Sequence, residues 1–131
     1  MSASDLLRRH LSLVGRAATR EELSIYADDL VVEFPYAPVD HTRRLEGPAG
    51  IARFMENIGK FARDIRMGEP TIYETDGGCV AEYTGNSVFT DTNLPYAQEY
   101  IVVVKVRDGK ISHIREYYDP MRVLRAMGEI D

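Results

Sequence analysis

The chain has 131 residues, enough for one compact domain and too few for a second domain with its own core. Apolar residues make up 44% and charged residues 28% of the sequence, which allows a packed core and excludes global disorder. The net charge of -5 opposes binding to a phosphate backbone, so nucleic acid is not an expected partner. The longest apolar run, residues 101–104, is far shorter than the ~20 residues that span a bilayer, so we expect no membrane contact.

The single cysteine, Cys79, has no partner for an internal disulfide, and the first ten residues lack a basic segment followed by an apolar core. We therefore expect a cytoplasmic protein. The sequence contains no Cys/His spacing suited to zinc, no glycine-rich phosphate loop and no nucleophile elbow. We accordingly expect neither a metal nor a cofactor.

Two helices are predicted before residue 30. Apolar residues at helical spacing predict the first from about Ser4 to Ala18, with His10 on its apolar face. Thr19 and Glu22 have the spacing of a capping box, which predicts a short second helix that includes Tyr26 and ends near residues 28–29.

A strand, a loop and a third helix are predicted next. The β-branched and apolar residues 30–34 predict a strand, and Pro35 and Pro38 then force an irregular loop through Asp40 and His41. Pro48 stands where a helix can begin, and an apolar stripe that includes Phe54 predicts the third helix.

The second half of the chain predicts four strands, over residues 61–74, 79–90, 96–107 and 111–119. Their short connections imply antiparallel neighbours. Pro120 opens a closing helix that presents Met121, Leu124 and Met127 and stops at Gly128. The predicted fold class is α+β: a curved, mostly antiparallel sheet with three helices from the N-terminal half on one face enclosing a pocket, plus a short C-terminal helix.

The strand over residues 98–107 predicts a partner. One of its faces carries Val102 and Val104, and the other carries Ile101 and Val103, so both faces are apolar at the centre. A sheet with helices on one side normally presents a polar second face to water, so the pattern predicts a homodimer through the outer sheet face. The alternative is that two β-branched residues are half-exposed on a twisted strand.

The last strand places a carboxylate on the predicted inner wall. If Ile114 faces the core, Ser112, Glu116 and Tyr118 point to the same side. The residues predicted to face outward are then Ile111, His113, Arg115, Tyr117 and Asp119. Apolar surroundings raise the pKa of a carboxyl group and suit it to acid or base work near neutrality. The alternative is that Glu116 pairs with an arginine such as Arg44 or Arg115, or that the alternation is out of register.

Further candidates surround the same pocket. His10 could act on a carbonyl group or as a base, although a lone histidine on an apolar face is often a core residue. Asp40 and His41 occupy a loop at the expected pocket mouth, where loop residues often act, although acidic loop residues are often merely solvated. The aromatic wall is expected to include Tyr83 and Tyr96, although several of its tyrosines could simply be core residues. The predicted ligand-binding residues are Tyr26, Phe34, Tyr36, Phe54, Tyr100, Val102 and Tyr118.

The chain resembles the nuclear transport factor 2-like superfamily, specifically its SnoaL-like and ketosteroid-isomerase-like members, over almost its whole length. The resemblance rests on the opening helices with Tyr26-Ala27-Asp28-Asp29, on Leu45-Glu46-Gly47, on Tyr96-Ala97-Gln98-Glu99-Tyr100, on Asp108-Gly109-Lys110-Ile111 and on Arg115-Glu116-Tyr117-Tyr118-Asp119-Pro120. That last motif is also similar to the tail of the phenazine biosynthesis A/B proteins. The resemblance implies one SnoaL-like domain over residues 1–131, a cone-shaped fold with a deep apolar cavity, dimers through the sheet, and cofactor-free work on ketones or polyketides.

The resemblance can be carried over residue by residue. The ketosteroid isomerase tyrosine, base and second aspartate fall on His10, Phe34 and Val102, so all three are replaced in this chain. The glutamate of the phenazine-type motif, an acid/base in that family, matches Glu116, and Asp119 replaces the usual asparagine.

Two functions follow as hypotheses. The first is a cofactor-independent enzyme that moves protons on a small, apolar, carbonyl-containing metabolite, as an isomerase, cyclase or condensing catalyst. In it, Glu116 transfers the proton, His10 polarises the enolate oxygen, and Asp40 or His41 assists. The second is a non-catalytic module that holds a small ligand or a partner peptide in the same cavity. The replacement of all three isomerase positions supports this second function, and a dry cavity with a Glu116–arginine salt bridge, or a purely aliphatic lining, would favour it further.

Overall fold

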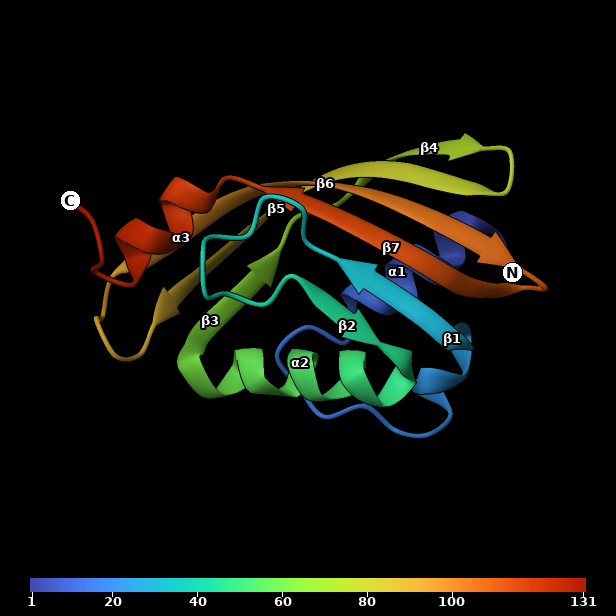
Figure 1. Cartoon of the computed structure of the whole chain (residues 1–131), viewed down its shortest axis with the longest axis horizontal. Coiled ribbons are helices and arrows are strands. Elements are labelled where there is room, and N and C mark those ends of the chain that lie inside the picture. Colours follow the sequence, from blue (N-terminus) through green and yellow to red (C-terminus); the bar gives the residue numbers. More distant parts are fainter.

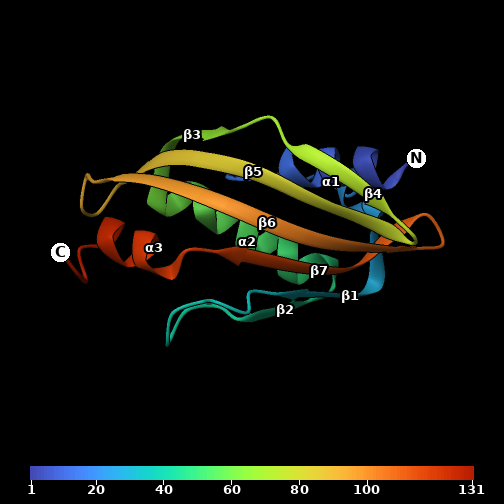
Figure 2. The ribbon, with the colours of Figure 1, turned by 90° about the horizontal axis from the view of Figure 1, so that it is seen from above.

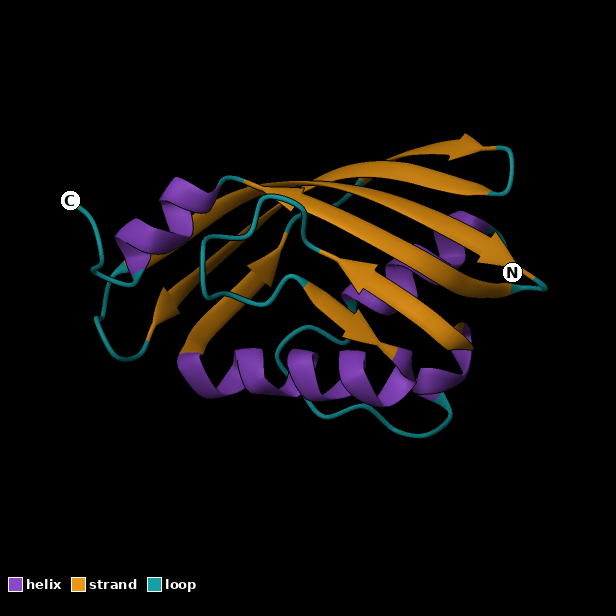
Figure 3. Ribbon diagram, in the orientation of Figure 1, coloured by secondary structure: helices purple, strands orange, loops and turns teal.

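A curved seven-stranded sheet forms the centre of the computed structural model, which describes residues 1–131 (Figures 1 and 3). The strand order is β2-β1-β7-β6-β5-β3, and β4 also pairs with β5. The strands are β1 (Tyr26–Glu33), β2 (Arg44–Glu46), β3 (Ala62–Met67), β4 (Thr71–Thr75), β5 (Gly78–Phe89), β6 (Pro95–Arg107) and β7 (Lys110–Tyr118).

Helices from the first half of the chain lie on one face of this sheet. They are α1 (Ala3–Leu11), the short 3-10 helix η1 (Glu22–Ile25) and α2 (Gly47–Phe61), and α3 (Pro120–Ala126) follows the last strand. Seen from above, β5, β6 and β7 lie over α2, and α1 lies beside it under β4 (Figure 2). None of these helices is long and apolar enough to cross a bilayer. The predicted fold class, an α+β cone with a mostly antiparallel sheet, is confirmed.

The antiparallel connections predicted for the second half of the chain are present. β5 pairs antiparallel with β6, and β6 with β7. β1 returns to the sheet beside β7 as a parallel neighbour, and the long loop after β1 leads to the antiparallel edge strand β2. This order brings the loop over residues 34–43 close to the last strand.

The first helix is shorter than predicted. A capping box between Ser2 and Asp5 begins α1 at Ala3, close to the predicted start at about Ser4. The helix ends at Leu11, and Gly15 beyond it has a left-handed backbone (φ +82°), which no α-helix can include. Residues 12–18 therefore form a loop, and His10 lies in the last turn of α1.

The second predicted helix was wrong beyond residue 25. Thr19 and Glu22 do form the reciprocal hydrogen bonds of a capping box, at 2.9 and 3.1 Å, but only the four residues of η1 follow. Tyr26 begins β1, and pairing with β7 buries it together with Leu30 in the main core. A register shift between Tyr26 and Val31 hides the strand periodicity from the sequence.

Two other predicted elements need correction. The strand predicted over residues 61–74 is instead two strands, β3 and β4, and Phe61 belongs to α2. The segment breaks at 68–70 around Pro70, and each part pairs separately with β5. The closing helix is present as α3, but Val123 and Ala126 are its buried residues, whereas Met121 is 46% exposed.

A bulge near the start of β7 changes which of its side chains face the core. Lys105 pairs with His113 and Val106 with Ile111, so Ser112 is an extra residue. Ile111 is therefore fully buried, contrary to the predicted outward orientation, and the Ser112 hydroxyl donates to the carbonyl oxygen of Lys105 at 3.2 Å. Beyond His113 the predicted alternation holds, and this part of the strand carries the candidate site.

Candidate active site

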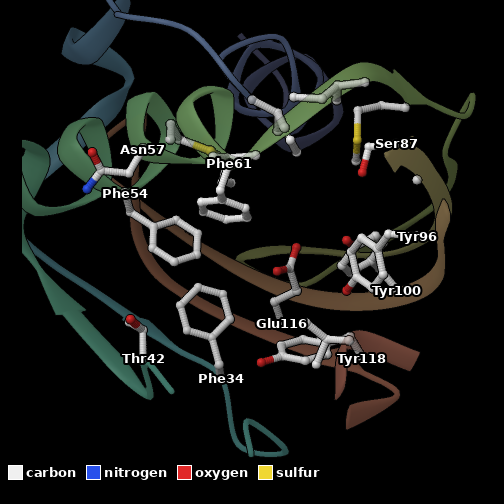
Figure 4. A pocket seen from close by; sticks show the side chains of 18 of the residues that line it. Phe34, Thr42, Phe54, Asn57, Phe61, Ser87, Tyr96, Tyr100, Glu116 and Tyr118 are labelled. Atoms are coloured by element: carbon white, nitrogen blue, oxygen red, sulfur yellow. The ribbon is translucent and has the colours of Figure 1, made fainter. Parts of the chain in front are cut away.

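A cavity of about 450 Å³ lies between α2 and the inner face of the sheet, within the size range of small-ligand pockets. Its lining is mostly apolar and comes from α1, α2, α3, the loop over residues 34–43 and the inner faces of β3 and β5–β7. No lysine or arginine lines it. The lining residues shown in Figure 4 surround one carboxylate, that of Glu116.

Three tyrosines cross the inner face of the sheet in one row. Tyr83 on β5 pairs with Tyr100 on β6, which pairs with Tyr118 on β7. The rings of Tyr83 and Tyr100 are stacked, with centroids 5.0 Å apart, and those of Tyr100 and Tyr118 are 6.4 Å apart at a steep angle. A Cβ atom at Gly85 would lie 3.1 Å from the Tyr100 ring, so glycine leaves room for that ring in the cavity wall.

Glu116 faces the cavity, as predicted. It lies opposite Val102 of β6, two residues before Tyr118 on the same face of β7, and its carboxylate points into the hollow (Figure 4). The Tyr83 hydroxyl donates a hydrogen bond to Glu116 Oε1. No protein group binds Oε2, which leaves this oxygen available to a ligand.

The alternative of an arginine partner for Glu116 is wrong. Arg44 lies on β2 and bonds Glu46 at 3.1 Å. Arg115 is the neighbour of Glu116 along β7 and projects from the other face of the sheet. The cavity therefore holds an acidic group whose only protein partner is a neutral hydroxyl.

Burial raises the pKa of Glu116 from about 4.5 to about 7. The side chain keeps some exposed surface because it faces the cavity, but protein atoms surround it on the other sides, which disfavours the charged form. The hydrogen bond from Tyr83 acts in the opposite direction, because it stabilises the carboxylate. A carboxyl group balanced in this way can both accept and donate a proton near neutral pH.

Replacing Tyr83 with phenylalanine should raise the pKa of Glu116 further. The variant keeps the ring that stacks on Tyr100 and removes only the hydrogen bond that lowers the pKa. We expect a rise of roughly one unit, the usual size of one hydrogen bond to a charged group. A side-chain ¹³C titration measures it, with Tyr36→Phe at the surface as the control. An unchanged or lower pKa would contradict the assigned hydrogen bond.

His10 lies at another part of the cavity wall and is neutral at physiological pH. Its side chain is buried, and burial lowers its pKa to about 4. Nδ1 lies 2.6 Å from the Tyr26 hydroxyl, and the two rings meet edge to face. No protein group binds Nε2, so this nitrogen can bond a ligand.

Asp40, His41 and Thr42 lie at the rim of the cavity, as expected for a loop at its mouth. Asp40 is exposed and has a left-handed backbone (φ +69°). His41 Nε2 lies 4.0 Å from a carboxylate oxygen of Glu129, so the loop faces the chain segment that follows α3. Phe61 of α2 also lines the cavity and is 41% exposed.

Four of the seven predicted ligand-binding residues line the cavity, namely Phe34, Phe54, Tyr100 and Tyr118. The rings of Phe34 and Phe54 are stacked 5.1 Å apart and face Glu116 across the hollow (Figure 4).

The other three predicted ligand-binding residues do not line it. Tyr36 is 61% exposed and packs on Tyr117 outside the cavity, because the proline-bordered loop turns it outward. Tyr26 lies behind His10, and Val102 is fully buried in the core. The position that matches the second aspartate of ketosteroid isomerase therefore has no access to the cavity here.

Two further residues complete the site and were not predicted as ligand-binding. Tyr83 was expected only as a wall residue, and its bond to Glu116 depends on a strand register that the sequence does not display. Tyr96 lines the cavity next to Tyr100 and is hydrogen-bonded by the buried Gln98. Tyr96 could have been found from the inward orientation that it shares with Gln98 and Tyr100 on one strand.

Comparisons with known proteins define the family. The model of the SnoaL-like domain matches residues 7–114, and the chain belongs to this family. A PhzA/B-like protein of Pseudomonas aeruginosa is 31% identical over 133 residues, which span 100% of this chain and 94% of the relative. Both results confirm the resemblance stated from the sequence motifs.

Solved structures share the fold at lower identity. An NTF2-like protein from Burkholderia xenovorans superposes with a TM-score of 0.80 at 20% identity, covering 95% of this chain and 94% of that one. A phenazine biosynthesis-related protein from Pseudomonas aeruginosa superposes with a TM-score of 0.72 at 17% identity, covering 96% and 89%. These likenesses support the cone-shaped NTF2-like architecture.

Proposed function

We propose that the protein is a cofactor-independent enzyme that transfers protons on a small, neutral, ketone-bearing metabolite, as an isomerase, cyclase or condensing catalyst. The observation that carries the proposal is the Glu116 carboxyl group, which faces an apolar cavity with one oxygen free and a pKa near 7. Its carboxylate takes a proton from the carbon next to the ketone and, once protonated, returns it to another atom.

The features of the cavity favour this activity over a non-catalytic binding module. A binding module would be favoured by a Glu116–arginine salt bridge or by an aliphatic lining, and neither is found. The wall is rich in tyrosine and phenylalanine, which suits planar or polycyclic ligands. Because no lysine or arginine lines the cavity, an anionic substrate would have no counter-charge, which supports a neutral one.

The remaining predicted catalytic residues have roles that follow from their positions. His10 is neutral, so its free Nε2 would hydrogen-bond a polar group of the substrate without acting as a cation. Asp40 and His41 lie at the mouth, where they would contact the substrate as it enters. We place them in binding and reserve the proton transfer for Glu116.

Solvent-deuterium exchange into a model ketone tests the proposal. The probe is 2-tetralone, a neutral bicyclic ketone with acidic protons next to its carbonyl group, incubated with the wild-type protein in D₂O and followed by ¹H NMR. We expect exchange at least about 100-fold faster than in buffer alone, the lower end of what a positioned base provides. Exchange at the buffer rate would contradict the proposal.

We also propose that a second copy of the chain covers the outer face of the sheet. Tyr73, Val80 and Val103 form an apolar row across β4, β5 and β6, and Ile101 is 46% exposed beside it. Tyr73 itself is 52% exposed. Such a continuous apolar face is typical of a surface that a partner buries.

The Ile101→Glu variant should therefore be a monomer. A charged side chain on each copy would be buried without a partner in the dimer, which costs several kcal/mol, while the isolated sheet face can solvate it. Size-exclusion chromatography with light scattering measures the mass, and Ile101→Val, which keeps the face apolar, is the control. A monomeric wild-type protein at micromolar concentration would contradict the dimer.

A further inference from the structure

The buried side chain of Gln98 uses all of its hydrogen-bonding groups. Its Oε1 accepts from the backbone N–H groups of Glu99 at 3.0 Å and Asp119 at 3.1 Å. Its Nε2 donates to the Asp119 carbonyl oxygen and to the Tyr96 hydroxyl oxygen, both at 2.9 Å. Gln98 is 1% exposed, so no water replaces these partners.

These contacts determine the orientation of the amide. A flipped amide would direct its NH₂ group at two backbone N–H donors, which is unfavourable. Gln98 must therefore donate to Tyr96, and the Tyr96 hydroxyl must direct its own hydrogen elsewhere. The Tyr96 ring packs on Phe89, with centroids 4.8 Å apart, which holds the hydroxyl at the cavity wall.

Tyr96 and Tyr100 lie on the same face of β6, and their side chains are neighbours in the cavity wall (Figure 4). Hydrogen bonding between their hydroxyl groups lowers the pKa of Tyr96 and raises that of Tyr100. Whichever of the two donates to the other, one phenolic hydrogen remains without a protein acceptor. Both side chains lie on the wall beside the Glu116 carboxylate (Figure 4). The pair therefore offers the cavity a hydrogen-bond donor next to the proposed base.

We propose that the hydroxyl pair of Tyr96 and Tyr100 binds the carbonyl oxygen of the substrate and stabilises the enolate, and that Gln98 is the positioning residue that orients it. This inference rests on the proposed function. Glu116 Oε2 takes the proton from the adjacent carbon, the C–H electron pair becomes the new C=C bond, and the C=O π pair moves to the oxygen that the phenol holds. Reprotonation of a carbon by the Glu116 carboxyl group reverses these changes.

The geometry favours this pair over His10 as the enolate donor. Tyr96 and Tyr100 lie beside the Glu116 carboxylate (Figure 4), whereas His10 is on α1, at another part of the cavity wall. The carbonyl oxygen and the reacting hydrogen of a ketone are on adjacent carbons, only three bonds apart, so the hydrogen-bond donor must lie near the base. His10 instead reaches a more distant polar group of the substrate.

The infrared carbonyl stretch of bound 2-tetralone tests the proposal directly, because it reports hydrogen bonding to the oxygen without requiring turnover. We expect a lowered frequency in the wild-type complex, and a return toward the unbonded value in the Tyr96→Phe/Tyr100→Phe double variant, which keeps both rings. Deuterium exchange should fall roughly 100-fold in that variant, as for the loss of an oxyanion donor. His10→Leu is the comparison variant and should leave the stretch unchanged.

The outcomes separate this inference from the proposed function. If the carbonyl stretch of the double variant equals that of the wild-type complex, or if the stretch changes only in His10→Leu, the tyrosine pair does not bind the carbonyl oxygen. Exchange that depends on Glu116 would still support the proposed function in that case. Exchange at the buffer rate in the wild-type protein overturns the function even if the stretch moves. In Tyr96→Phe alone we expect a smaller shift of the stretch, because Tyr100 retains its own hydroxyl.

Discussion

The Glu116→Gln variant should lose ketone proton exchange by roughly 10²–10⁴-fold, the usual contribution of a positioned acid/base group. Glutamine has the shape of glutamate and still accepts the hydrogen bond from Tyr83, but its amide cannot take up a proton near neutral pH. The rate of deuterium incorporation into 2-tetralone, measured by ¹H NMR, gives the loss.

Glu99→Gln is the matched control for this variant. Glu99 is an exposed glutamate on the outer face of β6, where it bonds Arg122 at 3.2 Å, so the same chemical change occurs outside the cavity. Its exchange rate should equal that of the wild-type protein. If Glu116→Gln retains exchange within a few-fold of wild type, Glu116 is not the proton carrier.

The Glu116→Gln substitution should also stabilise the fold at alkaline pH, which is the second large effect that we predict. The pKa of Glu116 is raised in the folded state, so between about 4.5 and 7 the folded protein binds more protons than the unfolded chain. Unfolding then becomes easier as the pH rises through this interval, and the penalty is complete above about 7. Glutamine has no charge to bury and avoids the penalty.

The advantage of Glu116→Gln over the wild-type protein in free energy of unfolding should grow by on the order of 2 kcal/mol from about pH 5 to about pH 8. For a chain of this size it corresponds to roughly 5–10 °C in Tm. Thermal unfolding of both proteins at the two pH values, followed by circular dichroism, measures the difference. A Glu116→Gln variant whose advantage over wild type does not grow with pH would contradict the raised pKa.

The periodic parts of the fold could be predicted from the sequence, and the irregular parts could not. The inward orientation of Glu116 and Tyr118 follows from strict alternation after His113, and α2 follows from its apolar stripe and Pro48. The bulge at Ser112 reversed the predicted orientation of Ile111, because one extra residue changes the parity of a strand.

The partners within the site lie beyond what a sequence pattern contains. The bond between Tyr83 and Glu116 joins residues 33 positions apart and depends on the register of β5, β6 and β7 together. The two hydrogen bonds between the Gln98 amide and the backbone of Asp119 likewise require that the end of β7 lies beside β6. Alternation reveals which face a side chain occupies, but only the assembled sheet reveals which neighbour it meets.

A site-resolved titration of the Glu116 carboxyl group tests the central claim most directly. Side-chain ¹³C NMR of protein labelled at glutamate, with Glu116→Gln to assign the signal, follows its chemical shift from acid to neutral pH. We predict a midpoint near 7, about 2.5 units above that of a solvated glutamate. A midpoint close to 4.5, the value of a solvated glutamate, would mean that water reaches this carboxylate freely, and the proposed proton transfer would lose its basis.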